Sequence, residues 1–194
     1  RTAYYSTSGL IDEARGFARG FDEVRQLNKD GITTAADALA EVSQAIGKAD
    51  GKRLYYVHLS ELRLPYRAPA ERIADWGVPG YNGPVGVAAM QNLIVMTNPT
   101  ETDGRQLEAW YDAAVGKFVK SLDEQTLVLI FGTHGNSLGE THLGYEQTIS
   151  PWELLMPYLF YMNGTQIGYR RPGVVRAGEL GATVLDLAST RPHD

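Results

Sequence analysis

Apolar residues follow a helical period in one stretch near the start of the chain. After Thr34, three apolar side chains recur at intervals of three and four residues and share one helical face: Leu39, Val42 and Ile46. Thr34 followed by Asp37 is typical of a capping box, in which each side chain bonds the other's backbone amide. Gly47 has the position of a C-terminal stop. The pattern predicts an amphipathic helix over residues 34–47.

Two later stretches show the same period. The clearer one places its apolar side chains on one face, and they are Leu107, Trp110, Tyr111, Ala114, Phe118 and Leu122. The shorter one contains Leu180, Val184 and Leu187. We therefore expect a long helix over residues 107–122 and a short helix near the end of the chain.

Short apolar runs indicate strands at three places, because they are too brief for helices and rich in aliphatic and aromatic residues. They are Leu54-Tyr-Tyr-Val-His-Leu59, Thr126-Leu-Val-Leu-Ile130 and Met156-Pro-Tyr-Leu-Phe-Tyr-Met162. The first two are expected to be buried, with His58 as a hydrogen-bonded core residue.

The remaining segments show no clear period. Residues 1–32 contain several glycines, and the element expected there is a short helix between Leu10 and Leu27. Prolines and glycines between Ser60 and Pro84 predict a long loop of the kind that often lines a functional site. Helices that alternate with strands in this order predict an α/β fold, with a largely parallel sheet flanked by helices.

Length and composition exclude several classes of protein. A chain of 194 residues suits a single domain over 1–194 with a substantial core. A net charge of −5 without a basic run argues against a nucleic-acid partner. No apolar stretch approaches the roughly 20 residues of a membrane-spanning helix. The absence of cysteine excludes disulfides and thiolate metal sites.

A glycine-flanked polar segment follows the predicted strand at 126–130, with His134 between Gly132 and Gly135. Ligands of open α/β sheets bind just beyond the carboxyl ends of strands, and the glycines allow a close backbone approach. Imidazole can bind a metal ion or act as an acid or base. The alternative is a histidine that is only hydrogen-bonded in a turn, and residue chemistry alone leaves both interpretations open.

The same segment carries a resemblance to a known family. Residues 131–140 read Phe-Gly-Thr-His-Gly-Asn-Ser-Leu-Gly-Glu, which resembles the Asp-His-Gly-Glu-Ser-Leu-Gly-Glu signature of the sulfatases and their relatives in the alkaline phosphatase superfamily. Other segments are similar to family segments in the same order: the Gly-Phe-Asp segment within 16–24, the strand ending in Leu-Pro-Tyr66, the helix from Tyr111 and Trp152-Glu-Leu-Leu-Met-Pro157. The resemblance covers most of the chain.

The resemblance implies an alkaline-phosphatase/sulfatase-like fold and a chemistry. In the family, a nucleophile and a divalent metal of the calcium or zinc class act on a sulfate or phosphate ester. His134 would be a metal ligand, and the substrate would be a sulfate or phosphate ester or another anionic ligand. The family also suggests a periplasmic or extracellular location.

Departures from the family pattern fall at its functional positions. Thr133 stands at the position of a metal-binding aspartate, where a neutral hydroxyl is a poor substitute. Arg63 stands where the family places a histidine that contacts the transferred group; a guanidinium can hold sulfate or phosphate oxygens, or it can be a solvated loop arginine. His142 lies near the position of a later family Lys or His, with a surface-loop role as the alternative. No Pro-x-Arg companion marks a nucleophile beside Ser6-Thr-Ser-Gly9.

Two functions therefore remain open, and no catalytic residue is identified for either. The favoured one is a degenerate sulfatase-like domain, used for binding or scaffolding, in which residues 1–194 form a partial domain without the N-terminal nucleophile region. The other is part of an active metal-dependent sulfatase, phosphatase or phosphoryl-group transferase, whose nucleophile lies on an absent segment.

Overall fold

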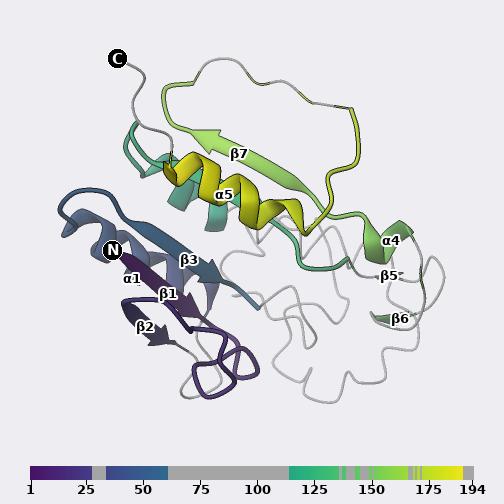
Figure 1. Ribbon diagram of the computed structural model, residues 1–194, viewed down its shortest axis with the longest axis horizontal. Helices are drawn as coiled ribbons and strands as arrows, with labels where there is room; N and C mark the ends of the chain where they lie inside the picture. The colour runs from purple at the N-terminus through teal and green to yellow at the C-terminus, as the bar shows by residue number, and fades with distance from the viewer. Residues whose placement is uncertain are drawn as a thin grey trace, which may run out of the picture. The chain divides into compact units, whose positions relative to one another are not determined.

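The computed structural model describes residues 1–27, 34–60, 114–135, 137–138, 143–144, 149, 151–165, 168, 170 and 172–189. The chain divides into two compact units, Arg1–Asn163 and Gly164–Asp194. Figure 1 shows the elements of both. The prediction of one domain over 1–194 stays a prediction.

The first unit begins with a parallel sheet of three strands in the order β2-β1-β3. Its strands are β1 (Thr2–Ser6), β2 (Glu23–Gln26) and β3 (Leu54–His58). The central strand β1 is buried from Ala3 to Ser6, and its residues pair in register with both neighbours. A mixed architecture of helices and parallel strands confirms the predicted α/β class.

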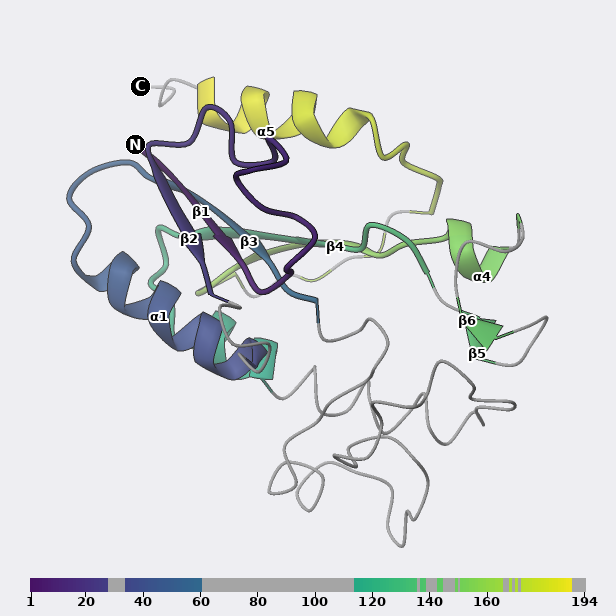
Figure 2. The same cartoon turned by 90° about the horizontal axis from the view of Figure 1, so that it is seen from below.

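Helix α1 (Ala35–Gly47) connects β2 to β3 and covers one face of this sheet (Figures 1 and 2). Its buried side chains Ala35, Ala38, Leu39 and Val42 form the apolar stripe that the sequence predicts. Val42 shares a core cluster with Ala3 and Tyr5 of β1. The helix therefore holds the sheet by contacts between small and branched side chains.

The predicted start of α1 and its predicted end at Gly47 are confirmed, but the end does not use a left-handed glycine. Thr34 and Asp37 form a complete capping box, in which Thr34 Oγ1 accepts from the Asp37 amide at 3.2 Å. The C-cap is Lys48 in a right-handed conformation, and its amide donates to the Ile46 carbonyl. Because the chain needs no left-handed residue here, Gly47 simply remains the last residue of the helix.

The prediction of a short helix between Leu10 and Leu27 is wrong. Residues 9–20 form bends and turns, and β2 follows them. Gly16 and Gly20 have φ angles of 82° and 92°, which belong to the left-handed region and do not continue a helix. The strand β1 before these turns was not expected from the sequence.

A second sheet in the first unit consists of β4 (Leu127–Phe131) and β7 (Tyr158–Met162). These strands match the predicted runs, but they pair antiparallel, with Leu129 opposite Phe160. The parallel arrangement therefore holds for β1–β3 and not for this pair. Strand β4 is less buried than predicted, since its interior is only half-buried, and Leu159 and Phe160 of β7 are exposed.

Residues 114–120 are helical, which confirms that part of the predicted helix, whereas 107–113 lie outside the described residues. Phe118 packs against the core cluster of β1 and α1. Asn163, just after β7, donates through Nδ2 to the carbonyls of Lys120 and Leu122. The segment 114–122 is thus tied both to the first sheet's core and to the end of β7.

The other elements are short or lie in the second unit. The two-residue strands β5 (Ser137–Leu138) and β6 (Leu143–Gly144) pair antiparallel, and α4 (Pro151–Leu154) precedes β7. The second unit contains α5 (Glu179–Ser189), which confirms the predicted terminal helix. In the part of the chain that the structure describes, no helix has the length and apolarity to cross a membrane.

Candidate functional site

The carboxyl ends of β1, β2 and β3 meet at one edge of the parallel sheet. Ser6, the last residue of β1, pairs with Gln26 of β2 and with His58 of β3. The segment that leaves this edge, Ser6-Thr7-Ser8, is unusually buried for three hydroxyl residues, with exposures of 0%, 2% and 5%. Ligands of such sheets bind beyond this edge, so the partners of these hydroxyls decide what the segment can do.

The hydroxyl of Thr7 is fully engaged by the segment after β3. It accepts a hydrogen bond from the Ser60 amide at 2.9 Å and lies 3.0 Å from Ser60 Oγ. The Thr7 amide donates to the His58 carbonyl at 3.0 Å. A hydroxyl held in this way closes the edge of the sheet and is not presented as an open nucleophile.

The flanking serines serve the backbone of the same loop. Ser6 Oγ accepts from the Ser8 amide at 3.1 Å, and Ser8 Oγ accepts from the Leu10 amide at 3.2 Å. The side chain of Gln26 donates to the Ser8 carbonyl. The sequence shows no companion that would mark a nucleophile in this segment, and the structure assigns the hydroxyls of Ser6 and Ser8 to turn formation.

The glycine-flanked corner around His134 follows the carboxyl end of β4. Thr133 and His134 are both exposed, and Thr133 Oγ1 lies 3.0 Å from His134 Nδ1. The sequence predicted that His134 lies just beyond the end of a strand, and the structure confirms this position. The neighbouring hydroxyl occupies one ring nitrogen, so Nδ1 is directed at the protein's own chain.

Gly132 lies close to the segment that enters β7. Its amide donates to the Pro157 carbonyl at 3.4 Å. A Cβ at this position would lie 3.4 Å from the Met156 Cβ and 3.6 Å from the Pro157 Cδ. The close approach is therefore between Gly132 and the segment that enters β7.

A ring cluster connects the β1 edge with this corner. Tyr4 stacks on Tyr56 with centroids 5.5 Å apart and rings 5° from parallel. Tyr56 contacts Phe131 at 6.4 Å, and Phe131 contacts Tyr158 at 6.2 Å. Burial raises the pKa of both Tyr4 and Tyr56, so their phenols stay protonated at neutral pH. The cluster places the end of β4 against β3.

The residues of the corner can be tested against the divalent metal that the family resemblance implies. Calcium takes six to eight oxygen ligands and zinc four N, S or O ligands, mostly charged ones. Thr133 and His134 supply one imidazole and one neutral hydroxyl, and no group of three or more His, Asp or Glu gathers within the described ranges. This pair alone does not fit such a metal, so no reaction step is assigned to one.

Two predicted substrate-binding residues, Arg63 and His142, lie outside the described residues. Their predicted roles, and those of His134 and Thr133 at a metal, stay predictions. Sequence reasoning missed the hydroxyl segment at the β1 edge. The aromatic pair Tyr4-Tyr5 favours a strand, but the segment Thr2–Ser6 shows no alternation that would have marked one.

Two solved structures are similar to this fold. One is the C-terminal periplasmic domain of EcEptC from Escherichia coli, with a TM-score of 0.62, 16% identity, and coverage of 84% of this chain and 48% of that one. The other is a protein in the alkaline phosphatase superfamily from Vibrio parahaemolyticus, with a TM-score of 0.54, 15% identity, and coverage of 85% and 38%. These similarities confirm the alkaline-phosphatase/sulfatase-like fold.

The chain spans less than half of the length of both solved structures that it matches. No protein-family model matches the sequence, and no curated protein matches it.

Proposed function

We propose that this chain is an alkaline-phosphatase-type domain that binds a sulfate, a phosphate ester or a related anion without turning it over. The observation that carries this proposal is the Thr133–His134 pair at the end of β4, where the threonine hydroxyl lies 3.0 Å from Nδ1. A carboxylate at position 133 would orient a cation, whereas a hydroxyl next to the imidazole adds no negative charge.

The buried hydroxyls at the other edge support the same interpretation. Thr7 is 2% exposed, and its oxygen is engaged by Ser60. A nucleophile needs an accessible oxygen and an adjacent base, whereas the Thr7 oxygen is buried and its partners among the described residues are Ser60 and the His58 carbonyl. Arg63 and His142 are the side chains proposed to hold the anion, Arg63 through the fork of its guanidinium. A periplasmic location is proposed from the EcEptC domain.

A second candidate follows from the coverage of the solved structures. Because this chain matches 48% and 38% of their lengths, it can be part of a longer, active metal-dependent sulfatase, phosphatase or phosphoryl-group transferase. The nucleophile and the acidic metal ligands would then lie outside these 194 residues. A Cys-x-Pro-x-Arg segment, or a Ser or Thr equivalent, upstream in the full-length gene would favour this second function.

The deciding experiment combines anion binding, metal content and turnover on the full 194-residue chain. Inorganic sulfate and phosphate are titrated by calorimetry, metals are measured by mass spectrometry, and nitrophenyl phosphate and sulfate serve as reporter esters. We expect saturable anion binding that Arg63→Gln weakens, together with no hydrolysis. A stoichiometric divalent ion, or hydrolysis that disappears in His134→Ala, would sink the non-catalytic proposal. If neither sulfate nor phosphate binds, the proposed binding role is wrong as well.

A further inference from the structure

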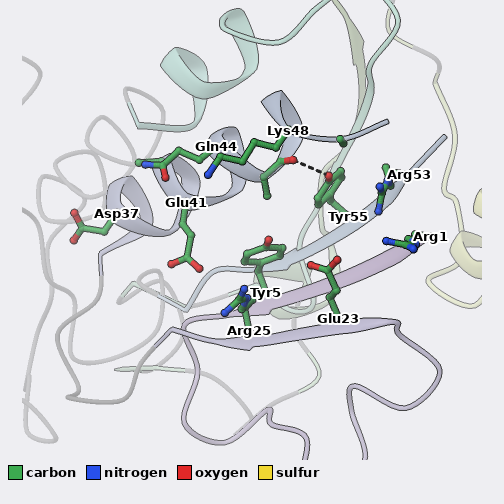
Figure 3. A pocket seen from close by; sticks show the side chains of 13 residues that line it. Arg1, Tyr5, Glu23, Arg25, Asp37, Glu41, Gln44, Lys48, Arg53 and Tyr55 are labelled. Carbon is green, nitrogen blue, oxygen red and sulfur yellow. Dashed lines mark hydrogen bonds between the residues drawn. The ribbon is translucent and has the colours of Figure 1, made fainter. Parts of the chain in front are cut away.

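A cavity of about 650 Å³ lies along the flank of α1, above the face of the parallel sheet. Figure 3 shows the side chains that line it. Its floor is formed by the rings of Tyr5 and Tyr55, and Ala40, Ala45 and Ala49 of the α1 region add apolar surface. This volume is in the range of sites for small molecules, which combine an apolar lining with a few polar groups.

The phenol of Tyr5 is the most informative group in this cavity. Tyr5 is only 2% exposed, yet its hydroxyl makes no hydrogen bond to any part of the chain that the structure describes. Tyr55 beside it does have a partner, because its hydroxyl donates to the Ala45 carbonyl at 3.3 Å. The Tyr5 oxygen is not one of the fully enclosed polar atoms that lack a partner among the described residues, so it opens onto the cavity, where it can donate to a ligand.

The charges around Tyr5 favour a hydrogen-bond donor at that position. Burial raises the pKa of the Tyr5 phenol, and the carboxylates of Glu23 and Glu41 raise it further, whereas Arg25 opposes them. The phenol is therefore neutral at ordinary pH and keeps its proton for an acceptor.

The sign of the charged residues on α1 changes from negative to positive along the cavity. Asp37, Glu41, Gln44 and Lys48 follow one another at intervals of three and four residues, so they share one face of the helix. The face is acidic in its first half and basic at its end, where Arg53 adds a second cation. Glu41 and Lys48 are seven residues apart, which corresponds to about 10 Å along a helix.

The charged side chains around the cavity do not form ion pairs with one another among the described residues. Arg15–Asp12 is the ion pair found among the described residues, and none of Glu41, Lys48 or Arg25 takes part in it. A solvated outer face of an amphipathic helix would explain the charges alone. Beneath them, however, the Tyr5 hydroxyl opens onto the cavity and has no hydrogen-bond partner among the described residues.

We propose that this cavity binds a small elongated zwitterion, with its ammonium group at Glu41 and its carboxylate or phosphate at Lys48 and Arg53. Its apolar middle would lie on the rings of Tyr5 and Tyr55, and an oxygen of the ligand would accept from the Tyr5 hydroxyl. A simple anion is a poorer fit, because the carboxylates of Glu23, Asp37 and Glu41 lie among the cations of Arg1, Arg25, Lys48 and Arg53 and would repel it. The site is independent of the function proposed above.

The test is a length series of ω-amino acids titrated into the full chain and followed by NMR. The series runs from 4-aminobutanoate to 10-aminodecanoate, with octanoate and octylamine as single-charge analogues and 8-aminooctyl phosphate as the phosphate arm. We expect 8-aminooctanoate to bind more tightly than the shorter members and than both single-charge analogues. The shifted resonances should belong to α1, β1 and β3.

Substitutions then locate the probe. Tyr5→Phe keeps the ring and removes only the hydroxyl, and we expect about a fivefold loss of affinity for 8-aminooctanoate. Glu41→Gln and Lys48→Gln are exposed and should fold normally, and each should lower affinity about two- to fivefold. Glu124→Gln and Lys120→Gln, which are exposed away from the cavity, are matched controls and should change nothing.

Three results would overturn the proposal. One is the absence of saturable binding by every member of the series and by the phosphate arm. Another is an affinity for octanoate or octylamine equal to that for 8-aminooctanoate, which would show that the site recognises only one of the two charges. The last is unchanged affinity in both Glu41→Gln and Lys48→Gln, which would place the probe elsewhere.

Discussion

The hydroxyl of Thr7 lies 3.0 Å from the hydroxyl of Ser60, so two residues 53 positions apart join the carboxyl ends of β1 and β3. The same oxygen of Thr7 accepts from the Ser60 amide at 2.9 Å. Because Thr7 is 2% exposed, water does not readily replace these partners. The pair fixes the loop that leaves β3 relative to the centre of the sheet.

Replacing Thr7 with Val should destabilise the fold, because the shape is kept while the Ser60 amide loses its acceptor. We expect the free energy of unfolding to fall by about 1–3 kcal/mol, the cost of an unsatisfied buried donor. Urea denaturation of the full chain measures the change. Thr183→Val in α5 is the matched control, since its hydroxyl only donates to the Glu179 carbonyl of its own helix. Equal losses in both variants would show that the Thr7–Ser60 contact has no special role.

Replacing Thr133 with Asp should give the corner a negative partner for His134 without restoring catalysis. We expect tighter binding of Zn²⁺ or Ca²⁺ by calorimetry, because a carboxylate is a far better ligand than a hydroxyl. Hydrolysis of nitrophenyl phosphate and sulfate should stay at background, since a nucleophile is still required. His134→Ala in the same background should remove the gain in affinity. Ester turnover by Thr133→Asp would contradict the degenerate interpretation.

The sequence predicted best those features that depend on neighbours in the chain. Thr34 and Asp37 are three residues apart, so their capping box and the start of α1 could be inferred directly. The placement of His134 just beyond β4 was likewise correct, because an apolar run followed by glycines marks the end of a strand. Local spacing was enough in both cases.

Features that depend on distant pairing were not predictable. The antiparallel contact of Leu129 with Phe160 is a choice of tertiary structure, and an apolar run reads the same in either direction. The strand β1 was hidden because its last four residues, Ala3–Ser6, are all buried, which removes the alternation that marks a strand. The engagement of Thr7 by Ser60 depends on the register of β1 with β3, which a single sequence does not contain.

The loss of folding stability at acidic pH should depend on Asp22. Its carboxylate accepts from the Thr2 amide at 2.7 Å, and this hydrogen bond is the main reason that its pKa lies below the usual 3.8. A carboxyl whose pKa is lowered in the folded state stabilises the protein at pH values above 3.8. This contribution is lost as the pH falls through the lowered pKa.

We therefore expect Asp22→Asn to be less stable than the unsubstituted chain at neutral pH, with a difference that shrinks below pH 3.8. Thermal unfolding at a series of pH values measures the difference. Added salt should change it little, since a hydrogen bond dominates over the charges of Arg1. A difference that is constant down to strongly acidic pH would contradict this assignment.

The loss of folding stability at alkaline pH should depend on the buried tyrosines. Burial raises the pKa of Tyr4, Tyr5 and Tyr56 above 10.0, so the folded state holds these protons more tightly than the unfolded state. Their contribution to stability is complete below pH 10.0 and is lost as the pH rises through the raised values. Phenolate absorbance should therefore show one group of tyrosines that ionises later than the exposed ones, together with unfolding.

Tyr56→Phe keeps the ring that stacks on Tyr4 and should remove one late-ionising phenol. If all tyrosines ionise together in a single early step, the burial of these rings is not maintained in solution.

Two glycines should respond differently to alanine because their backbones differ. Gly20 has a φ of 92°, and no atom lies within 4 Å of the place that a Cβ would take, so alanine there has space but the wrong conformation. A left-handed alanine costs about 1–2 kcal/mol, and we expect Gly20→Ala to lose that much stability. Gly132 lacks a left-handed φ, and its Cβ would meet Met156 at 3.4 Å, an ordinary contact distance.

Gly132→Ala should therefore cost less than Gly20→Ala, whereas Gly132→Leu should be clearly destabilising because its larger side chain would displace Met156. Urea denaturation of the three variants gives the order directly. A loss in Gly132→Ala larger than that in Gly20→Ala would mean that the corner before Thr133 is closed more tightly against β7 than the Met156 contact indicates, and that its glycine cannot be exchanged.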